Sequence, residues 1–388
     1  MTATERLFDI DPGMNEFDAL VISCEPEKGK FKVVLDRTAF FPEEGGQSCD
    51  KGTLGGFEVI SVHEKDLVIA HFLSEPLNVG GTVHGVIDRE KRFSDMQQHT
   101  GEHIVSGIVH SMFGYDNVGF HLGSAVTTMD YSGELHAEDI RKVELAANRA
   151  VYENIPVNVL YPDPDELERM DYRSKKELTG KIRIVEIPGY DLCACCAPHV
   201  SRTGEIGIIK IVDFEKYKGG TRVYLLCGYR ALSDYNAKES SVMSLSALLS
   251  AKPEEVYPAA EVIFLNEQKE RYDNGVLKTK LMEYEIASLP EYPAGLAYFS
   301  EYLDKKNMKR AFQMICARSA GLFGCFSGND TDGYTFFLGD RSGDARVPGK
   351  KFLEQFGGRG GGSAEMFQGS VKVSQAEIHE FFIKYTNN

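Results

Sequence analysis

Two short clusters of metal-binding residue types constrain the fold of this chain more than any other feature of its sequence. His99 and His103 stand four residues apart. On a helix such a pair shares one face, where both imidazoles can bind one metal ion. Cys195 and His199 have the same spacing much later in the chain. Three neutral imidazoles and one thiolate suit Zn²⁺, so we expect the fold to bring the two clusters together.

Several alternatives stay open at this site. The metalloprotease pattern His-Glu-x-x-His is absent, because Thr100 follows His99. Cys193 and Cys196 stand close enough to Cys195 to be rival ligands. Four protein ligands normally indicate a structural zinc, whereas a catalytic zinc keeps one position for water. The sequence does not choose between these two kinds of site.

Composition places the chain among soluble globular proteins. Its 388 residues, 42% hydrophobic and 26% charged, are enough for two or three domains. No apolar run reaches about 18 residues and the N-terminus is too polar for a signal peptide, so we expect no membrane span and a cytoplasmic location. Eight cysteines, three of them between residues 193 and 196, suggest metal chemistry rather than a disulfide scaffold.

Charge restricts the partners of the chain. A net charge of −15 argues against indiscriminate binding to nucleic acids. The last part of the chain differs, because residues 341–388 carry seven Lys and Arg against five Asp and Glu. This segment also holds a dense glycine run at residues 357–362. Such a run frees backbone N–H groups for phosphate or a close-packed partner, although a mobile loop has the same composition.

The pattern along the chain is α+β rather than alternating βαβ. Residues 1–88 hold short β-rich runs that fit a small barrel or sandwich, with a glycine-rich stretch at 41–52 that is either a hairpin loop or a loop presenting Gln47 to a substrate. Residues 89–113 have helical periodicity, with Gly114 as the C-cap. Residues 115–132 are expected to be a loop leading into a strand. Residues 229–289 are mostly helical, as a connector or a dimer contact.

These motifs resemble the AlaX family of freestanding alanyl-tRNA editing proteins, which is related to the editing and C-terminal domains of alanyl-tRNA synthetase. The resemblance is carried by FFPEEGGQSCDKGTL, HTGEH, CCAPHVSRTGEIG and GGTRVYLLCG, and by GGRGGGSAEMFQG near the C-terminus. It covers nearly the whole chain and implies the long form of the family. One departure from the synthetase is Cys196-Ala197-Pro198, where the synthetase has Gly-Gly-Thr.

The resemblance implies an α+β protein with four parts. These are a β-barrel with the glycine-rich loop (1–88), a zinc-binding α+β editing core (89–232), a helical connector (233–290), and an α/β domain like the one associated with DHH proteins (291–388). A homodimer through the connector or the last domain is a further expectation.

The resemblance also implies roles for individual residues. His99, His103, Cys195 and His199 correspond to the zinc ligands. Gln47 is placed at the substrate end of the pocket, and His121 is a further pocket residue, so both are catalytic candidates. Contacts to tRNA are expected from Arg359 and the glycine-rich backbone around it, at Gly358, Gly360 and Gly361.

The implied reaction is hydrolysis of the ester that joins serine to tRNA for alanine, with glycine as a second candidate. No class II aminoacylation motifs precede the barrel, so the chain is expected to remove amino acids from tRNA and not to attach them. The editing domain of threonyl-tRNA synthetase has a similar zinc motif, which leaves the amino acid open. One alternative is a zinc-stabilised RNA-binding module without hydrolytic activity. A DHH-type phosphoesterase ranks last, because the sequence has no Asp-His-His.

Overall fold

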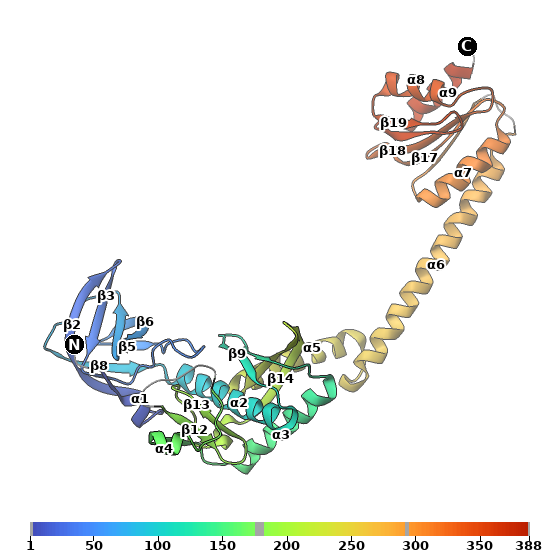
Figure 1. Ribbon diagram of the computed structural model, residues 1–388. Coiled ribbons are helices and arrows are strands. Elements are labelled where there is room, and N and C mark those ends of the chain that lie inside the picture. Colours follow the sequence, from blue (N-terminus) through green and yellow to red (C-terminus); the bar gives the residue numbers. More distant parts are fainter. Residues whose placement is uncertain (1–2, 175–181, 292–294, 387–388) are drawn as a thin grey trace. The chain divides into compact units, whose positions relative to one another are not determined.

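The computed structural model describes residues 3–174, 182–291 and 295–386 (Figure 1). The chain divides into two units, Met1–Ser244 and Leu245–Asn388. Both units mix helices with mainly antiparallel sheets, so the predicted α+β class is confirmed. The division into four parts stays a prediction. No helix in the described ranges is long and apolar enough to cross a membrane.

The N-terminal part of the first unit is built from six strands that pair in a closed barrel, in the order β2-β3-β7-β6-β5-β8. Side chains of β2 alternate between solvent and the interior, so that Phe17, Ala19 and Val21 are buried. A two-residue parallel pair, β1 with β4, and the one-turn helix α1 lie outside this ring. The bounds of these elements are β1 Glu5–Arg6, α1 Leu7–Ile10, β2 Glu16–Glu27, β3 Lys30–Leu35, β4 Arg37–Thr38, β5 Gly52–Leu54, β6 Phe57–Lys65, β7 Val68–Leu73 and β8 Thr82–Ile87.

The rest of the first unit packs helices α2 and α3 against a four-stranded antiparallel sheet of order β14-β15-β10-β9. A three-stranded sheet, β11-β12-β13, lies beside α2 through β13. The bounds are α2 Arg89–Phe113, β9 Asn117–Leu122, β10 Thr127–Tyr131, α3 Ala137–Glu153, β11 Asn158–Leu160, α4 Pro164–Leu167, β12 Ile184–Ile187, β13 Asp191–Ala194, η1 Thr203–Ile206, β14 Ile209–Tyr217, β15 Gly220–Cys227 and α5 Gly228–Leu249.

Helix α2 forms where the sequence predicts it, and local signals explain both of its ends. Asp88 is the N-cap and accepts a hydrogen bond from the backbone N–H of Lys91. Gly114 ends the helix with a φ of 71°, in the left-handed region that favours glycine. Residues 95–109 are buried without interruption, so α2 is the central helix of the unit and can hold functional side chains away from water.

Residues 115–132 differ from the prediction of a loop followed by one strand. Residues 117–122 form strand β9, which pairs with β10 along most of its length. Phe120 and Met129 stand opposite each other in this pair. Strand β9 contains glycine and polar residues, which are weak strand formers. It is a strand because it pairs with β10, and this pairing has no local sequence signal.

The second unit carries a five-stranded sheet of order β16-β17-β18-β20-β19, in which only β16 and β17 are parallel. The last four residues of the glycine run form the edge strand β19, rather than a mobile loop, and all four are exposed. The bounds are η2 Pro253–Glu255, α6 Val256–Ser288, β16 Gly295–Ser300, α7 Lys305–Arg318, β17 Leu322–Asn329, β18 Gly333–Asp340, α8 Arg346–Phe356, β19 Arg359–Gly362, β20 Phe367–Val371 and α9 Gln375–Thr386.

The predicted helical connector corresponds to α5 and α6 (Figure 1). Near its C-terminal end, α6 buries Met282 and Ile286 in the core of the second unit, together with Leu296 and Ile315. Its residues 260–275 are all exposed. The end of α6 is therefore an integral part of the second unit, while the homodimer expected through the connector stays a prediction.

Candidate metal centre

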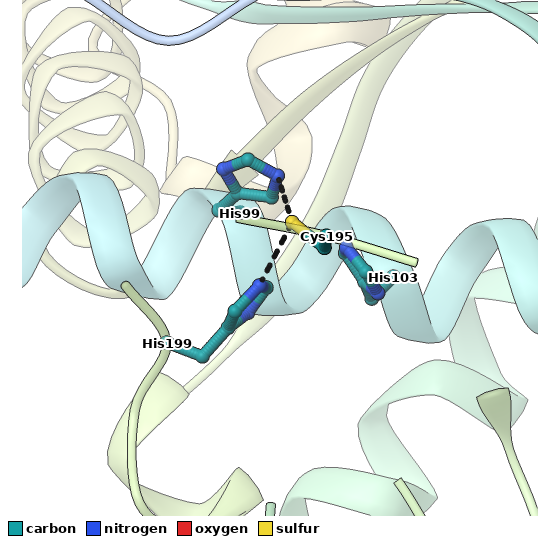
Figure 2. Close-up of side chains that lie close together, drawn as sticks. All are labelled: His99, His103, Cys195 and His199. Atoms are coloured by element: carbon teal, nitrogen blue, oxygen red, sulfur yellow. Dashed lines mark hydrogen bonds between the residues drawn. The ribbon is translucent and has the colours of Figure 1, made fainter. Parts of the chain in front are cut away.

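Helix α2 presents His99 and His103 on one face, as the spacing of the two residues requires. Both side chains are almost fully buried. The loop that follows β13 brings Cys195 and His199 to the same place (Figure 2). The sulfur of Cys195 lies 3.5 Å from Nε2 of His99 and 3.4 Å from Nε2 of His199.

One metal ion fits among these four side chains. One ligand atom from each residue lies within 4.8 Å of the others. The predicted meeting of the two clusters is therefore confirmed. Three imidazole nitrogens and one sulfur form a donor set that transition metals of intermediate softness prefer.

The outer nitrogen of each histidine has its own partner, which orients the ring. Nδ1 of His99 lies 2.7 Å from Oε1 of Gln47, and Nδ1 of His103 lies 2.9 Å from Oδ2 of Asp191. Nδ1 of His199 lies 3.0 Å from Oγ1 of Thr100. A proton held on Nδ1 leaves the lone pair of Nε2 for a metal. This pattern of outer partners is typical of metal-binding histidines.

The electrostatics of the four side chains also fit a cation. Burial raises the pKa of the Cys195 thiol, but His99 and His199 and the hydrogen bonds from His103 and His199 hold it well below its ordinary value. Burial lowers the pKa of His199 to about 3, although the neighbouring Cys195 acts to raise it. Burial also acts to lower the pKa of His103, but Cys193, Asp191 and Cys195 raise it well above its ordinary value.

Cys193 and Cys196, the two rivals of Cys195, lie in different surroundings. Cys193 forms a second group with His103 and Asp191, but Nε of Arg173 donates to Asp191 at 2.7 Å and brings a fixed positive charge there. Cys196 packs with the barrel core near Gly45. Burial raises the pKa of both thiols, so neither is disposed to be a thiolate.

Alkylation of the metal-free chain should distinguish the three thiols. We expect iodoacetamide at pH 7 to modify Cys195 before Cys193 and Cys196, because the thiolate is the reactive form and only Cys195 has a lowered pKa. Added zinc should protect Cys195. Peptide mapping by mass spectrometry measures the order, and earlier labelling of Cys193 or Cys196 would contradict this assignment.

Gln47 reaches the site from the glycine-rich loop, which is fastened to β9. The backbone N–H of Leu122 donates to the carbonyl of Gly46 at 2.8 Å. Gly46 has a φ of 84°, and a Cβ there would lie 2.7 Å from the carbonyl oxygen of Phe120, so only glycine fits this approach. Gln47 is 1% exposed and contacts the Nδ1 edge of His99. This position is behind the histidine, on the side away from the Cys195 sulfur.

His121, although it belongs to the same unit, does not join the cluster. His121 is exposed on β9, opposite Thr128 of β10. Gly358, Arg359, Gly360 and Gly361 are exposed in the second unit. A cavity of about 470 Å³ adjoins His199 instead and is lined by barrel and core residues, among them Asp11, Arg89 and Phe93. The catalytic role of His121 stays a prediction.

Sequence reasoning missed the outer partners Asp191 and Thr100 and the buried Glu102. Asp191 precedes Cys193 and Cys195 at alternate positions, which share one face of a strand, so its place beside the cluster had a sequence signal. Glu102 is fully buried, and its Oε1 accepts hydrogen bonds from Ser106 at 2.7 Å and Asn117 at 2.6 Å. Nothing in the local pattern distinguishes it from a surface residue of α2.

Two regions of the chain match models of known families. Residues 182–224, which include Cys195 and His199, match the threonyl and alanyl tRNA synthetase second additional domain. Residues 14–91 match the class II (A) tRNA synthetases. The fold and the site thus define a protein of the class related to aminoacyl-tRNA synthetases.

Full-length relatives identify the family. The chain is 30% identical over 382 residues to alanyl-tRNA editing protein Aarsd1-B of Xenopus laevis, covering 92% of each protein. It is 29% identical over 394 residues to alanyl-tRNA editing protein AlaX-L of Pyrococcus horikoshii, covering 97% of this chain and 96% of the relative. An alanine–tRNA ligase of Ignicoccus hospitalis is 33% identical over 304 residues, which is 32% of that enzyme. The chain belongs to the family of alanyl-tRNA editing proteins, as its motifs predicted.

Proposed function

We propose that this chain is a zinc-dependent hydrolase that removes serine, and glycine as a second substrate, from mischarged tRNA for alanine. The single observation that carries the proposal is the buried group of His99, His103, Cys195 and His199, in a chain whose relatives of matching length are named alanyl-tRNA editing proteins. Mischarged tRNA is accordingly the proposed partner, and the cytoplasm is the proposed location.

Zinc is the metal we propose, because imidazole and thiolate together suit Zn²⁺ and its tetrahedral preference. Zinc bound there would activate a water molecule, polarise the ester carbonyl or fix the substrate. We favour a positioning role, since four protein ligands complete a tetrahedral shell. The contribution of this chain is then to keep the histidine rings oriented through Gln47, Asp191 and Thr100. An aminoacyl ester is labile enough for positioning and stabilisation of developing charge to account for much of its hydrolysis.

The geometry supports Gln47 as a residue that orients His99, and its predicted catalytic contact with the substrate is part of the same proposal. Selection of serine over alanine would follow from a polar group that hydrogen-bonds the serine hydroxyl. With alanine bound, that group would be buried without a partner, and such sites reject the wrong substrate by roughly 10⁴-fold or more. Glycine would have to be admitted by size alone.

The proposal is tested by measuring metal content and serine release on the same preparation. We expect about one zinc per chain, loss of serine release after zinc is stripped with a chelator, and recovery when zinc is returned. The second candidate, an RNA-binding module stabilised by zinc, predicts bound zinc and bound tRNA without release of serine. Zinc-loaded chain that binds tRNA but leaves the ester intact would therefore favour the second candidate.

The second unit is proposed to hold the body of the tRNA through shape and phosphate contacts. Its edge strand β19 exposes the backbone of Gly360 and Gly361 beside Arg359, and Gly358 precedes the strand with a φ of 98°.

Removal of the second unit should weaken tRNA binding and leave zinc in place. The cut belongs near Ala251, between α5 and η2, because a cut after α6 would expose Met282 and Ile286. We expect at least a tenfold rise in the Kd for tRNA, by analogy with the loss of several phosphate contacts. Filter binding measures it, with elemental analysis for zinc. Unchanged tRNA affinity would exclude the second unit as the tRNA-holding part.

A further inference from the structure

Arg183 is a buried cation beside the loop that carries two of the four metal-binding side chains. It stands immediately before β12 and is 8% exposed. Its Nη1 donates to the backbone carbonyl of Cys195 at 2.8 Å and to that of Ala197 at 3.0 Å. Its own carbonyl accepts a hydrogen bond from the N–H of Cys195 at 3.1 Å. Three hydrogen bonds thus join this one residue to the segment between Cys195 and His199.

The loop that Arg183 contacts packs against the barrel core but, within the described ranges, has few other backbone hydrogen bonds. Residues 195–199 form neither helix nor strand, so their backbone groups lack the partners that a ladder would provide. Thr100 contacts the far end of the loop, at Nδ1 of His199 and at the N–H of Val200. Among the described residues, Arg183 is the donor found for the carbonyls of Cys195 and Ala197. It therefore holds the end of the loop where the thiol is placed.

The guanidinium suits this task for two reasons. Its N–H groups lie in one rigid plane, so the two hydrogen bonds from Nη1 fix both the distance and the direction of the Cys195 and Ala197 carbonyls. Its charge is balanced nearby, since Nε lies 3.6 Å from Oδ1 of Asp9. By contrast, the two histidines of α2 depend on a helix that is buried and capped independently of the loop.

We propose that Arg183 is a positioning residue for the metal centre, holding the backbone of residues 195–197 so that the Cys195 sulfur faces His99 and His199. This inference rests on the proposed zinc-dependent function. Without the guanidinium, two carbonyls in a mostly buried loop lose their donor, and a buried acceptor without a partner is unfavourable, so the loop is expected to relax. Metal sites require ligand distances within about 0.2 Å of ideal, so a loop that relaxes binds zinc less well.

The test compares zinc affinity in four full-length chains: the wild type, Arg183→Met, Arg183→Lys and Arg222→Met. Methionine keeps much of the volume of arginine and removes every donor. Lysine keeps the charge but lacks the planar fork. Arg222 is the matched control, because it makes two hydrogen bonds to Asp130 at 2.6 and 2.8 Å from β15, and within the described ranges it makes no hydrogen bond to the loop. Competition with a chelating indicator gives the Kd for zinc, and unfolding of the zinc-free chains in urea checks their fold.

We expect Arg183→Met to raise the Kd for zinc by about 10–100-fold, the range found when outer partners of metal ligands are lost. Arg183→Lys should fall between this variant and the wild type, and Arg222→Met should stay within about twofold of the wild type, as a surface change does. Cobalt substitution adds a spectroscopic test: the thiolate-to-cobalt charge-transfer band should weaken in Arg183→Met and persist in Arg222→Met. A merely structural role would not alter this band in a folded chain.

A folded Arg183→Met chain with wild-type zinc affinity and a wild-type cobalt spectrum would overturn the inference. Should that variant fail to fold, Arg183→Lys decides, and wild-type affinity there would overturn it. A wild-type chain that binds zinc and releases serine, together with unaffected Arg183 variants, would refute the positioning role alone. A wild-type chain that binds no zinc would refute the proposed function and this inference together.

Discussion

Replacing His103 with alanine is expected to remove the metal and to lower the rate of serine release from seryl-tRNA for alanine by at least about 10²–10³-fold, the cost of losing one charge-stabilising group in a hydrolytic site. His103 supplies one of three imidazoles, and its ring is 1% exposed. Alanine would leave only three protein donors and would also strip Asp191 of its hydrogen bond from Nδ1. Elemental analysis for zinc and single-turnover deacylation measure the two effects.

His110 is the matched control for His103. It lies two turns further along α2, is half-exposed, and its Nδ1 contacts Asp116 at 3.1 Å. His110→Ala should retain zinc and wild-type deacylation. If His103→Ala kept both its zinc and its activity, His103 would not be a ligand and the metal centre would be misassigned.

Replacing Asp50 with alanine is expected to destabilise the first unit by about 3–5 kcal/mol, because it leaves a buried charge without its partner. Asp50 and Arg92 are 1% and 3% exposed and form a bidentate pair between the barrel and α2. Arg92 also donates to the carbonyls of Pro12, at 2.8 Å, and Ala39, at 2.6 Å. The pair thus fastens the barrel to the helix that carries the metal-binding histidines.

The urea dependence of hydrogen exchange in barrel and α2 peptides measures this loss. Asp234→Ala is the control, since Asp234 pairs with Lys238 on the surface of α5 at 2.6 Å, and an exposed pair of this kind contributes about 0–1 kcal/mol. A loss below about 1 kcal/mol for Asp50→Ala would show that the buried pair does not hold the barrel to α2.

Helix α2 and the metal cluster could be predicted from the sequence because their signals are local. The helix has an apolar period and a glycine that ends it at residue 114, and the histidines share a face through their spacing alone. Cys195 and His199 added a second pair with the same spacing. We predicted that this pair lies beside α2 because three imidazoles and one thiolate together suit a single Zn²⁺ ion.

The choice among the three cysteines could not be predicted from their spacing, because it depends on tertiary distances, and only the family resemblance indicated Cys195. Cys193 and Cys195 occupy alternate positions and point to one side of the chain, where both lie near His103. Cys195 is distinguished from Cys193 because its sulfur also lies next to His99 and His199. The role of Arg183 has the same origin, since its contacts are to backbone carbonyls, which carry no sequence signal.

The structures of the two glycine-rich stretches also depend on tertiary contacts that the sequence does not show. The stretch at 41–52 was open between a hairpin loop and a substrate loop. In the structure Gly46 allows its backbone to approach Phe120, which brings Gln47 to His99. Residues 359–362 of the run at 357–362 form the edge strand β19, because β20 supplies their hydrogen-bond partners. The glycine content of both stretches indicated that their backbones are accessible. It did not indicate that the first stretch contacts β9 and His99, or that the second pairs with β20.

The chain belongs to the alanyl-tRNA editing proteins, and we propose that it edits by removing the wrong amino acid from tRNA for alanine. The most direct measurement compares deacylation of seryl-tRNA and alanyl-tRNA for alanine by the same zinc-loaded chain. We predict that serine is released faster by several orders of magnitude, as expected for a site that pairs with the serine hydroxyl. Equal and negligible release from both tRNAs would contradict the account.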